Sequence, residues 1–352
     1  MSSAPLPLVV QYLYVHGRDE GFFYPNTRAA SPGGLVARYL ECALTQAGSL
    51  RLQNAECDLA LATNIGERAT LGRTEAELIG RLEALGVEML ATDYLHRPAE
   101  GTKVYVASRY VLDAIISATA SQPAERVLWL TDLDCVWADP ALVFASAPVA
   151  SEIGCIYMGY GPDADAVGHG ADGRTRLAIG ELAEAMGGSI QAPPWVGGEL
   201  LCGTPGALRE LVSVCEEIDS TLGQQGKGLP NEEQVLTMAG ATGRVSFSDL
   251  SRVARRVPTG PRNQAPRVED PQSIGLWHLP SEKGLSLRRT AQELRDGRVK
   301  PLREDLSDPS RAARRFNVAG TGLRRRLRDD GWLAVQRVRR ATASARAWPA
   351  GP

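Results

Sequence analysis

The chain has 352 residues, 43% of them hydrophobic, which is enough apolar surface for one large domain with a buried core. Its net charge of −2 gives no reason to expect a nucleic acid as a partner. The charge is unevenly spread, because residues 301–352 hold 12 basic against 5 acidic residues. We therefore expect a single domain over residues 1–300 and a basic C-terminal extension over residues 301–352.

The first 130 residues alternate short apolar runs with amphipathic helical patterns. The apolar runs predict strands at residues 8–15, 57–63, 87–90 and 126–130. Helical spacing of apolar residues predicts helices at 34–46, 75–85 and 106–118. This βαβαβαβ order is typical of a parallel sheet with helices on both faces, and ligands bind beyond the carboxyl ends of such strands.

The second half of the chain is less regular. Apolar runs predict strands at 153–158, 198–202 and 274–278, and helical patterns cover 174–186, 205–220 and a segment that begins at 232. The fold class we expect is α/β, with a mostly parallel, Rossmann-like central sheet flanked by helices in a single domain.

The composition also bears on the compartment. No stretch approaches the roughly 20 apolar residues that span a bilayer, and the N-terminus lacks the basic region of a secretory signal. The six cysteines form no CxxC pair and lie mostly in apolar runs, as is typical of a reducing compartment. We therefore expect a cytoplasmic protein with no transmembrane segment. For the basic extension, packing on the domain and partial disorder are the main alternatives, and peripheral contact with an anionic membrane surface is another.

Two carboxylates, Asp132 and Asp134, follow the apolar run at 126–130. If the strand continues, its period of two points both side chains to the same side. Carboxylates this close repel one another, and a hard cation such as Mg²⁺ or Mn²⁺ is the natural compensation. Such an ion would stabilise a diphosphate leaving group. The alternative is an acidic turn whose aspartates only cap a helix.

The order of further segments resembles that of GT-A fold glycosyltransferases, in particular the retaining family related to glycogenin and the bacterial galactosyltransferases. The matching segments are, in chain order, Ala107-Ser108-Arg109-Tyr110, Asp132-Leu133-Asp134, Trp195-Val196-Gly197-Gly198-Glu199, Asn231-Glu232-Glu233-Gln234 and Trp277-His278-Leu279-Pro280-Ser281-Glu282-Lys283-Gly284. The resemblance spans residues 8–285. It implies a GT-A fold and the transfer of a hexose from a nucleotide-diphosphate sugar, most often a UDP-sugar, to an acceptor hydroxyl.

The resemblance also implies roles for particular residues. The metal ligands would be Asp132, Asp134 and His278, holding Mn²⁺ or Mg²⁺. Donor contacts would come from Tyr12, Tyr14, Arg109, Asp132 and Lys283, together with Asp58 and Asn64, which we place near the end of the second strand. Acceptor contacts would come from Trp195, Gly197 and Gly198, with core packing as the alternative for the indole.

Two departures from the family pattern leave the catalytic groups open. The family usually has Asn-x-Gly where this chain has Gly197-Gly198-Glu199, and it often has Asp-Gln where this chain has Glu232-Glu233-Gln234. Glu199 is therefore a candidate nucleophile or ion-pair stabiliser at the sugar carbon. Glu232 or Glu233 is a candidate general base for the acceptor hydroxyl, and capping of a helix is the alternative for both. Retention and inversion both remain open.

Three other functions fit parts of the sequence. Residues 132–137, DLDCVW, resemble the signature of haloacid dehalogenase-type phosphatases, but that signature normally follows the first strand. A nucleotidyltransferase needs a glycine-rich basic loop after the first strand, and residues 16–21 are too acidic for one. The third alternative is a non-enzymatic binding protein built on the nucleotide-sugar fold.

Overall fold

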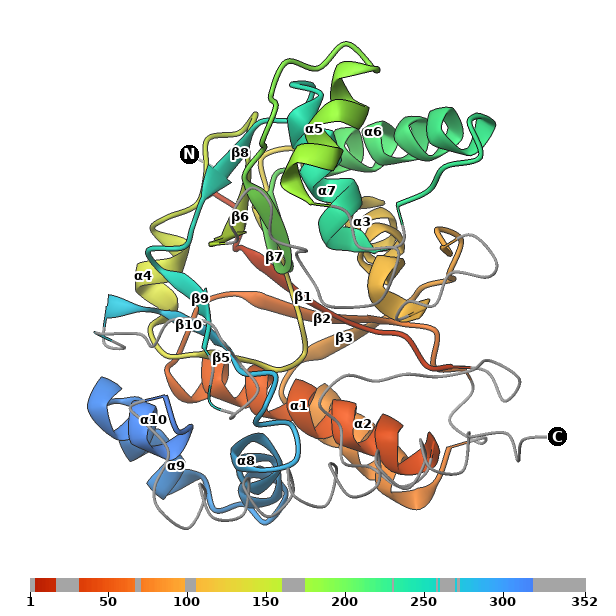
Figure 1. The fold of residues 1–352 in the computed structure, drawn as a ribbon. Helices are drawn as coiled ribbons and strands as arrows, with labels where there is room; N and C mark the ends of the chain where they lie inside the picture. The colour runs from red at the N-terminus through yellow and green to blue at the C-terminus, as the bar shows by residue number, and fades with distance from the viewer. Residues whose placement is uncertain are drawn as a thin grey trace, which may run out of the picture.

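The computed structural model describes residues 4–16, 32–66, 71–98, 106–159, 175–229, 231–257, 259, 270 and 273–318. Its centre is a seven-stranded sheet in the order β3-β2-β1-β4-β7-β6-β8 (Figure 1). The strands are β1 (Leu8–Leu13), β2 (Asp58–Thr63), β3 (Val87–Ala91), β4 (Leu128–Thr131), β6 (Ile153–Met158), β7 (Trp195–Gly203) and β8 (Phe247–Asp249). The first four pair in parallel, whereas β7 runs antiparallel to both β4 and β6.

Helices cover both faces of the sheet. One side carries α1 (Pro32–Leu52), α2 (Arg73–Ala84), α8 (Ser286–Arg295), α9 (Val299–Leu306) and α10 (Pro309–Arg315). The other carries α3 (Tyr110–Thr119), α5 (Arg176–Glu184), α6 (Pro205–Gln224) and α7 (Glu232–Ala241) (Figure 1). The short η2 (Val106–Arg109) precedes α3, and α4 (Pro140–Phe144) lies between β4 and β6 in the chain.

Each strand contributes to two cores because its side chains alternate between the faces. On β4, Trp129 belongs to the apolar cluster under α1, while Leu128 and Leu130 belong to the cluster under α3 and α6. All three side chains are completely buried. This two-sided burial explains why the strand reads in the sequence as a continuous apolar run.

A second, three-stranded sheet lies beside the first. It has the order β5-β10-β9, made of β5 (Cys135–Trp137), β9 (Ala254–Arg256) and β10 (Leu276–His278). β5 follows β4 after only three residues, so the chain passes directly from the large sheet into the small one. Those three residues are Asp132, Leu133 and Asp134, and the junction of the two sheets is therefore where the two carboxylates lie.

The expected α/β class with a mostly parallel central sheet is confirmed. The six cysteines, which lie mostly in apolar runs of the sequence, are all free and buried. No helix in the described part of the chain is long and apolar enough to cross a membrane.

The domain boundary at residue 300 stays a prediction. Residues 299–315, which we placed mostly in the extension, form α9 and α10 (Figure 1). Buried side chains of these helices, among them Leu302, Leu306 and Ala312, belong to the same apolar cluster as α1. Residues 319–352, including most of the Arg-rich segment, lie outside the described residues.

Candidate metal and donor site

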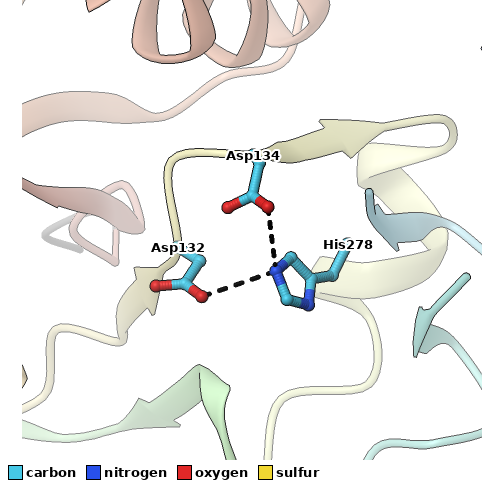
Figure 2. A group of neighbouring side chains, drawn as sticks. All are labelled: Asp132, Asp134 and His278. Atoms are coloured by element: carbon cyan, nitrogen blue, oxygen red, sulfur yellow. Dashed lines mark ion pairs between the residues drawn. The ribbon is translucent and has the colours of Figure 1, made fainter. Parts of the chain in front are cut away.

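Asp132, Asp134 and His278 converge on one point (Figure 2). The same imidazole nitrogen, Nε2, lies 3.5 Å from Oδ2 of Asp132 and 3.2 Å from Oδ2 of Asp134. One ligand atom from each residue lies within 4.8 Å of the other two. Two carboxylate oxygens and an imidazole nitrogen at this spacing can hold a divalent cation.

The expectation that strand periodicity aligns the two aspartates is wrong. β4 ends at Thr131 and β5 begins at Cys135, so Asp132 and Asp134 lie in the turn between the two sheets. The turn brings both carboxylates to the same imidazole because Leu133, which separates them, is buried in the core under α1.

Backbone pairing fixes the site from two directions. The Asp132 amide donates to the Glu199 carbonyl at 3.0 Å, which extends the β4–β7 ladder by one residue. The Leu279 amide donates to the Asp134 carbonyl at 2.8 Å, which extends the β5–β10 ladder. Each aspartate is therefore held by a different sheet, and β10 delivers His278 to the point between them.

The charges of the site are strongly coupled. Burial would raise the pKa of Asp134, but the cationic Lys283 and His278 outweigh burial and hold that pKa below its usual range. Burial raises the pKa of Asp132, and His278 opposes this shift. Burial disfavours the charged form of His278, but the carboxylates of Asp134 and Glu199 raise its pKa to about 9. Without a cation, the imidazole is therefore protonated at neutral pH.

This protonation predicts a pH-dependent metal affinity. A histidine binds a metal only when its ligating nitrogen is deprotonated, so a cation at this site must displace a proton below pH 9. We expect the dissociation constant for Mn²⁺ to fall about tenfold for each pH unit between 6 and 8. Titration of Mn²⁺ followed by electron paramagnetic resonance measures this directly. A constant affinity over that range would remove His278 from the ligand set.

Lys283 supplies a cation beside the cluster. Its Nζ lies 3.2 Å from Oδ2 of Asp134 and 5.0 Å from the centroid of the Tyr39 ring on α1. The lysine carbonyl also accepts a hydrogen bond from Arg38 at 3.4 Å. The side chain is only 8% exposed, so its charge is fixed in place next to the two aspartates.

A second charged group lies behind His278, on the side away from the aspartates. Glu199 of β7 faces the other ring nitrogen, Nδ1, at 3.4 Å and also pairs with Arg256 of β9. The Arg256 guanidinium reaches Glu233 of α7 at 2.9 Å, and Glu233 accepts a hydrogen bond from the Trp195 indole at 2.8 Å. Both glutamates are buried, so Arg256 balances two negative charges inside the protein.

Glu232 and Tyr12 lie close enough to Asp132 to interact with it electrostatically. The Tyr12 hydroxyl donates to the Gly198 carbonyl at 3.0 Å, and burial together with the nearby Asp132 raises its pKa well above the ordinary value. Burial and the Glu233 carboxylate raise the pKa of Glu232 well above its ordinary value. A Cβ at Gly198 would lie 2.6 Å from Cγ of Glu232, so glycine is what lets α7 approach β7 here.

The other predicted site residues have structural partners. Tyr14 packs against Tyr94 and Tyr110, and Arg109 forms an ion pair with Asp219 of α6. Asn64 lies at the carboxyl end of β2, but its amide oxygen accepts from the Val15 amide at 2.6 Å and its nitrogen donates to the Val15 carbonyl at 2.8 Å. These contacts hold the ends of β1 and β2 together.

The placement of Asp58 near the end of the second strand needs correction. Asp58 is the first residue of β2, at its amino end, where it pairs with Arg126. Because parallel strands point the same way, it lies at the edge of the sheet opposite to Asp132 and is not brought to the cluster. Trp195 is completely buried, which favours the core-packing interpretation of its indole over stacking on a sugar.

Arg256 is the functional candidate that the sequence did not reveal. It lies in a three-residue strand, next to an exposed arginine, with no motif around it. Only the parallel pairing of β9 with β10 places it opposite His278.

No protein-family model matches the sequence, and comparison with curated proteins finds no significant relative. Solved structures, in contrast, share the fold. The galactosyltransferase LgtC, in complex with donor and acceptor sugar analogs, is 10% identical with a TM-score of 0.50, over 82% of this chain and 95% of that one. The apo bifunctional glycosyltransferase WbbM is 11% identical with a TM-score of 0.52, over 87% of this chain and 52% of that one. The chain thus has the GT-A glycosyltransferase fold that the order of its motifs predicted.

Proposed function

We propose that this protein is a divalent-metal-dependent glycosyltransferase that moves a hexose from a nucleotide-diphosphate sugar, most simply a UDP-sugar, to an acceptor hydroxyl. The observation that carries the proposal is the convergence of Asp132, Asp134 and His278 at the sheet junction of a GT-A fold. The cytoplasm is the proposed location, and the acceptor is a molecule with a free hydroxyl.

Of the two cations considered, the donor set favours Mn²⁺ over Mg²⁺. Mg²⁺ prefers an all-oxygen shell, whereas an imidazole with two carboxylates suits Mn²⁺. Bound there, the cation would neutralise the diphosphate of the donor and stabilise it as a leaving group. Asp132, Asp134 and His278 would hold the ion, and the fixed Nζ of Lys283 offers a further positive charge to the phosphate oxygens.

Glu232 is the better placed of the two candidate bases. Glu233 is already engaged by Trp195 and Arg256, whereas Oε2 of Glu232 is buried and has no hydrogen-bond partner among the described residues. Burial and the Glu233 carboxylate raise the pKa of Glu232 above its ordinary value, which makes its carboxylate a stronger base. We therefore assign Glu232 the role of the general base that accepts the proton of the acceptor hydroxyl. Tyr12, Gly197 and Gly198 line the same region.

The phosphatase alternative is not supported, because the GT-A fold is not that of the haloacid dehalogenase family. A non-enzymatic role differs from the proposal in one observable. A binding protein would retain nucleotide-sugar without turning it over, whereas a transferase releases the nucleoside diphosphate when an acceptor is supplied.

The first test is a thermal-shift panel of UDP, GDP and ADP, each with Mn²⁺ and with EDTA. At 100 times its dissociation constant, a ligand adds about 2.7 kcal/mol to the apparent stability. We expect one nucleoside diphosphate, UDP foremost, to stabilise the protein with Mn²⁺ and not with EDTA. The monophosphate of the same base serves as the control, since it lacks the β-phosphate. If no nucleotide stabilises the protein in Mn²⁺, the proposed donor site is wrong.

A further inference from the structure

The two ring nitrogens of His278 face different carboxylates. Nε2 points to Asp132 and Asp134, while Nδ1 lies 3.4 Å from Oε1 of Glu199. Among the described residues Nδ1 forms no hydrogen bond, so the ion pair with Glu199 is its recorded polar contact. An imidazole that ligates a metal through one nitrogen carries its remaining proton on the other, and a carboxylate there fixes the tautomer and the ring orientation. Glu199 occupies that place.

The Glu199 carboxylate is held where it is. Its side chain is only 1% exposed, and its backbone is fixed by the hydrogen bond from the Asp132 amide. A Cβ at Gly197 would collide with Oε2 of Glu199, so the carboxylate folds back over the α-carbon of that glycine. Pairing with Arg256 restrains it from the other side.

Arg256 keeps this carboxylate charged. Burial alone would raise the pKa of Glu199, but Arg256 and His278 outweigh burial and lower that pKa to about 2. The parallel pairing of β9 with β10 sets Arg256 and His278 side by side, so the guanidinium and the imidazole approach the same carboxylate. Glu233 provides the second anchor for the arginine at 2.9 Å.

We infer that Glu199 is a positioning residue that orients His278 for metal binding and, held by Arg256, acts through the imidazole and not on the sugar. The inference rests on the proposed metal site and revises the role of nucleophile considered from the sequence. The Glu199 carboxylate faces Nδ1, the nitrogen of His278 that points away from the metal site, and it is paired with the Arg256 guanidinium. A nucleophile, in contrast, must be free to reach the sugar carbon.

The test is Mn²⁺ binding to the full chain, measured by electron paramagnetic resonance without any nucleotide. Glu199→Gln keeps the shape of the side chain and removes its charge. We expect it to weaken Mn²⁺ binding between about tenfold and a hundredfold, which is the range seen when a residue that orients a metal ligand is replaced. Glu199→Asp, which keeps the charge but withdraws the carboxylate from Nδ1, should also weaken binding and serves if the first variant does not fold.

Asp113→Asn provides a matched control. Asp113 is likewise a buried carboxylate paired with an imidazole, because its Oδ1 lies 2.8 Å from Nδ1 of His96. It belongs to α3, away from the cluster, and also accepts hydrogen bonds from the amides of Leu95 and His96. This variant removes the same kind of interaction from the fold, and we expect its Mn²⁺ affinity to match that of the wild type.

A double-mutant cycle separates action through His278 from direct action on the metal. In a His278→Ala background, Glu199→Gln should cause no further loss of Mn²⁺ affinity, because the group it orients is gone. Additive losses in the double variant, or wild-type affinity in both Glu199→Gln and Glu199→Asp, would overturn the inference while leaving the metal site intact. If the wild-type chain itself binds no Mn²⁺, the proposed site fails and the inference fails with it.

Discussion

Replacing Asp134 with asparagine is expected to reduce hexosyl transfer at least a hundredfold in a protein that remains folded. Asp134 is 1% exposed, and its Oδ2 lies 3.2 Å from both Nε2 of His278 and Nζ of Lys283. The amide keeps the shape of the side chain but removes the charge on which two cationic groups and the proposed cation converge. A hundredfold loss corresponds to about 2.7 kcal/mol of transition-state stabilisation.

The measurement is the release of nucleoside diphosphate from its hexose conjugate with saturating Mn²⁺ and acceptor. Asp139→Asn is the matched control, since Asp139 lies five residues further along and, among the described residues, its side chain only caps α4, where asparagine is an equally good cap. Circular dichroism confirms folding of both variants. If Asp134→Asn turns over at a near-normal rate, the metal cluster does not carry the reaction.

The fold was predictable because its strongest signals are local. A completely buried strand reads as a continuous apolar run, and β4 shows this with Leu128, Trp129 and Leu130. The change of pattern after Thr131 marked the carboxyl end of that strand, where ligands bind in such sheets. The position of Asp132 and Asp134 at the end of this strand is therefore enough to identify them as candidate ligands. What brings their side chains together, however, is the turn after the strand and not the strand itself.

The details of the site depend on long-range pairing, which no local pattern encodes. His278 meets Asp134 only because β10 pairs with β5 across about 140 residues of chain. Arg256 reaches Glu199 only because β9 lies beside β10. The sequence shows how far along the chain Glu199 lies from Asp132 and Asp134, but it does not show on which side of His278 Glu199 lies. The sequence alone therefore makes Glu199 a candidate at the sugar carbon.

The helices after residue 285 were missed for a compositional reason. Their apolar positions, such as Leu287 and Leu302, are completely buried against the α1 side of the core. Between them lie many arginines, several of which are fixed by ion pairs, as when Arg315 pairs with Asp305 at 2.8 Å. Frequent charge hides a short amphipathic pattern when the partner surface is unknown. The sequence therefore predicts no helix here, and it leaves packing on the domain and partial disorder as alternatives for residues 301–352.

Replacing Arg256 with leucine is expected to lower the free energy of unfolding by about 3 kcal/mol at pH 7, because it leaves Glu199 and Glu233 buried without their shared counter-charge. The loss of stability caused by Arg256→Leu depends on pH, and the direction of that dependence follows from the pKa of the two carboxyls. In the wild type, the pKa of Glu199 is lowered to about 2, so its stabilising contribution is complete above the unfolded pKa of about 4.3 and is lost as the pH falls toward 2. In the variant, only His278 still opposes burial at Glu199 and only the Trp195 indole opposes it at Glu233. The pKa of both carboxyls therefore rises, and taking up a proton as the pH falls removes the cost of the buried charge.

The difference in stability between wild type and Arg256→Leu should therefore be largest near neutral pH and should shrink as the pH falls from about 5 toward 2. Urea unfolding at pH 7 and at pH 4 measures it. Arg255→Leu is the control, because Arg255 is the neighbouring, exposed residue of the same strand and, within the described part of the chain, its side chain donates only to the Ser251 carbonyl at 2.8 Å. We expect that variant to stay within about 0.5 kcal/mol of the wild type at both pH values. Equal stability of the two arginine variants at pH 7 would show that the buried glutamates do not depend on Arg256, since the loss of a true counter-charge must cost more than the loss of a surface contact.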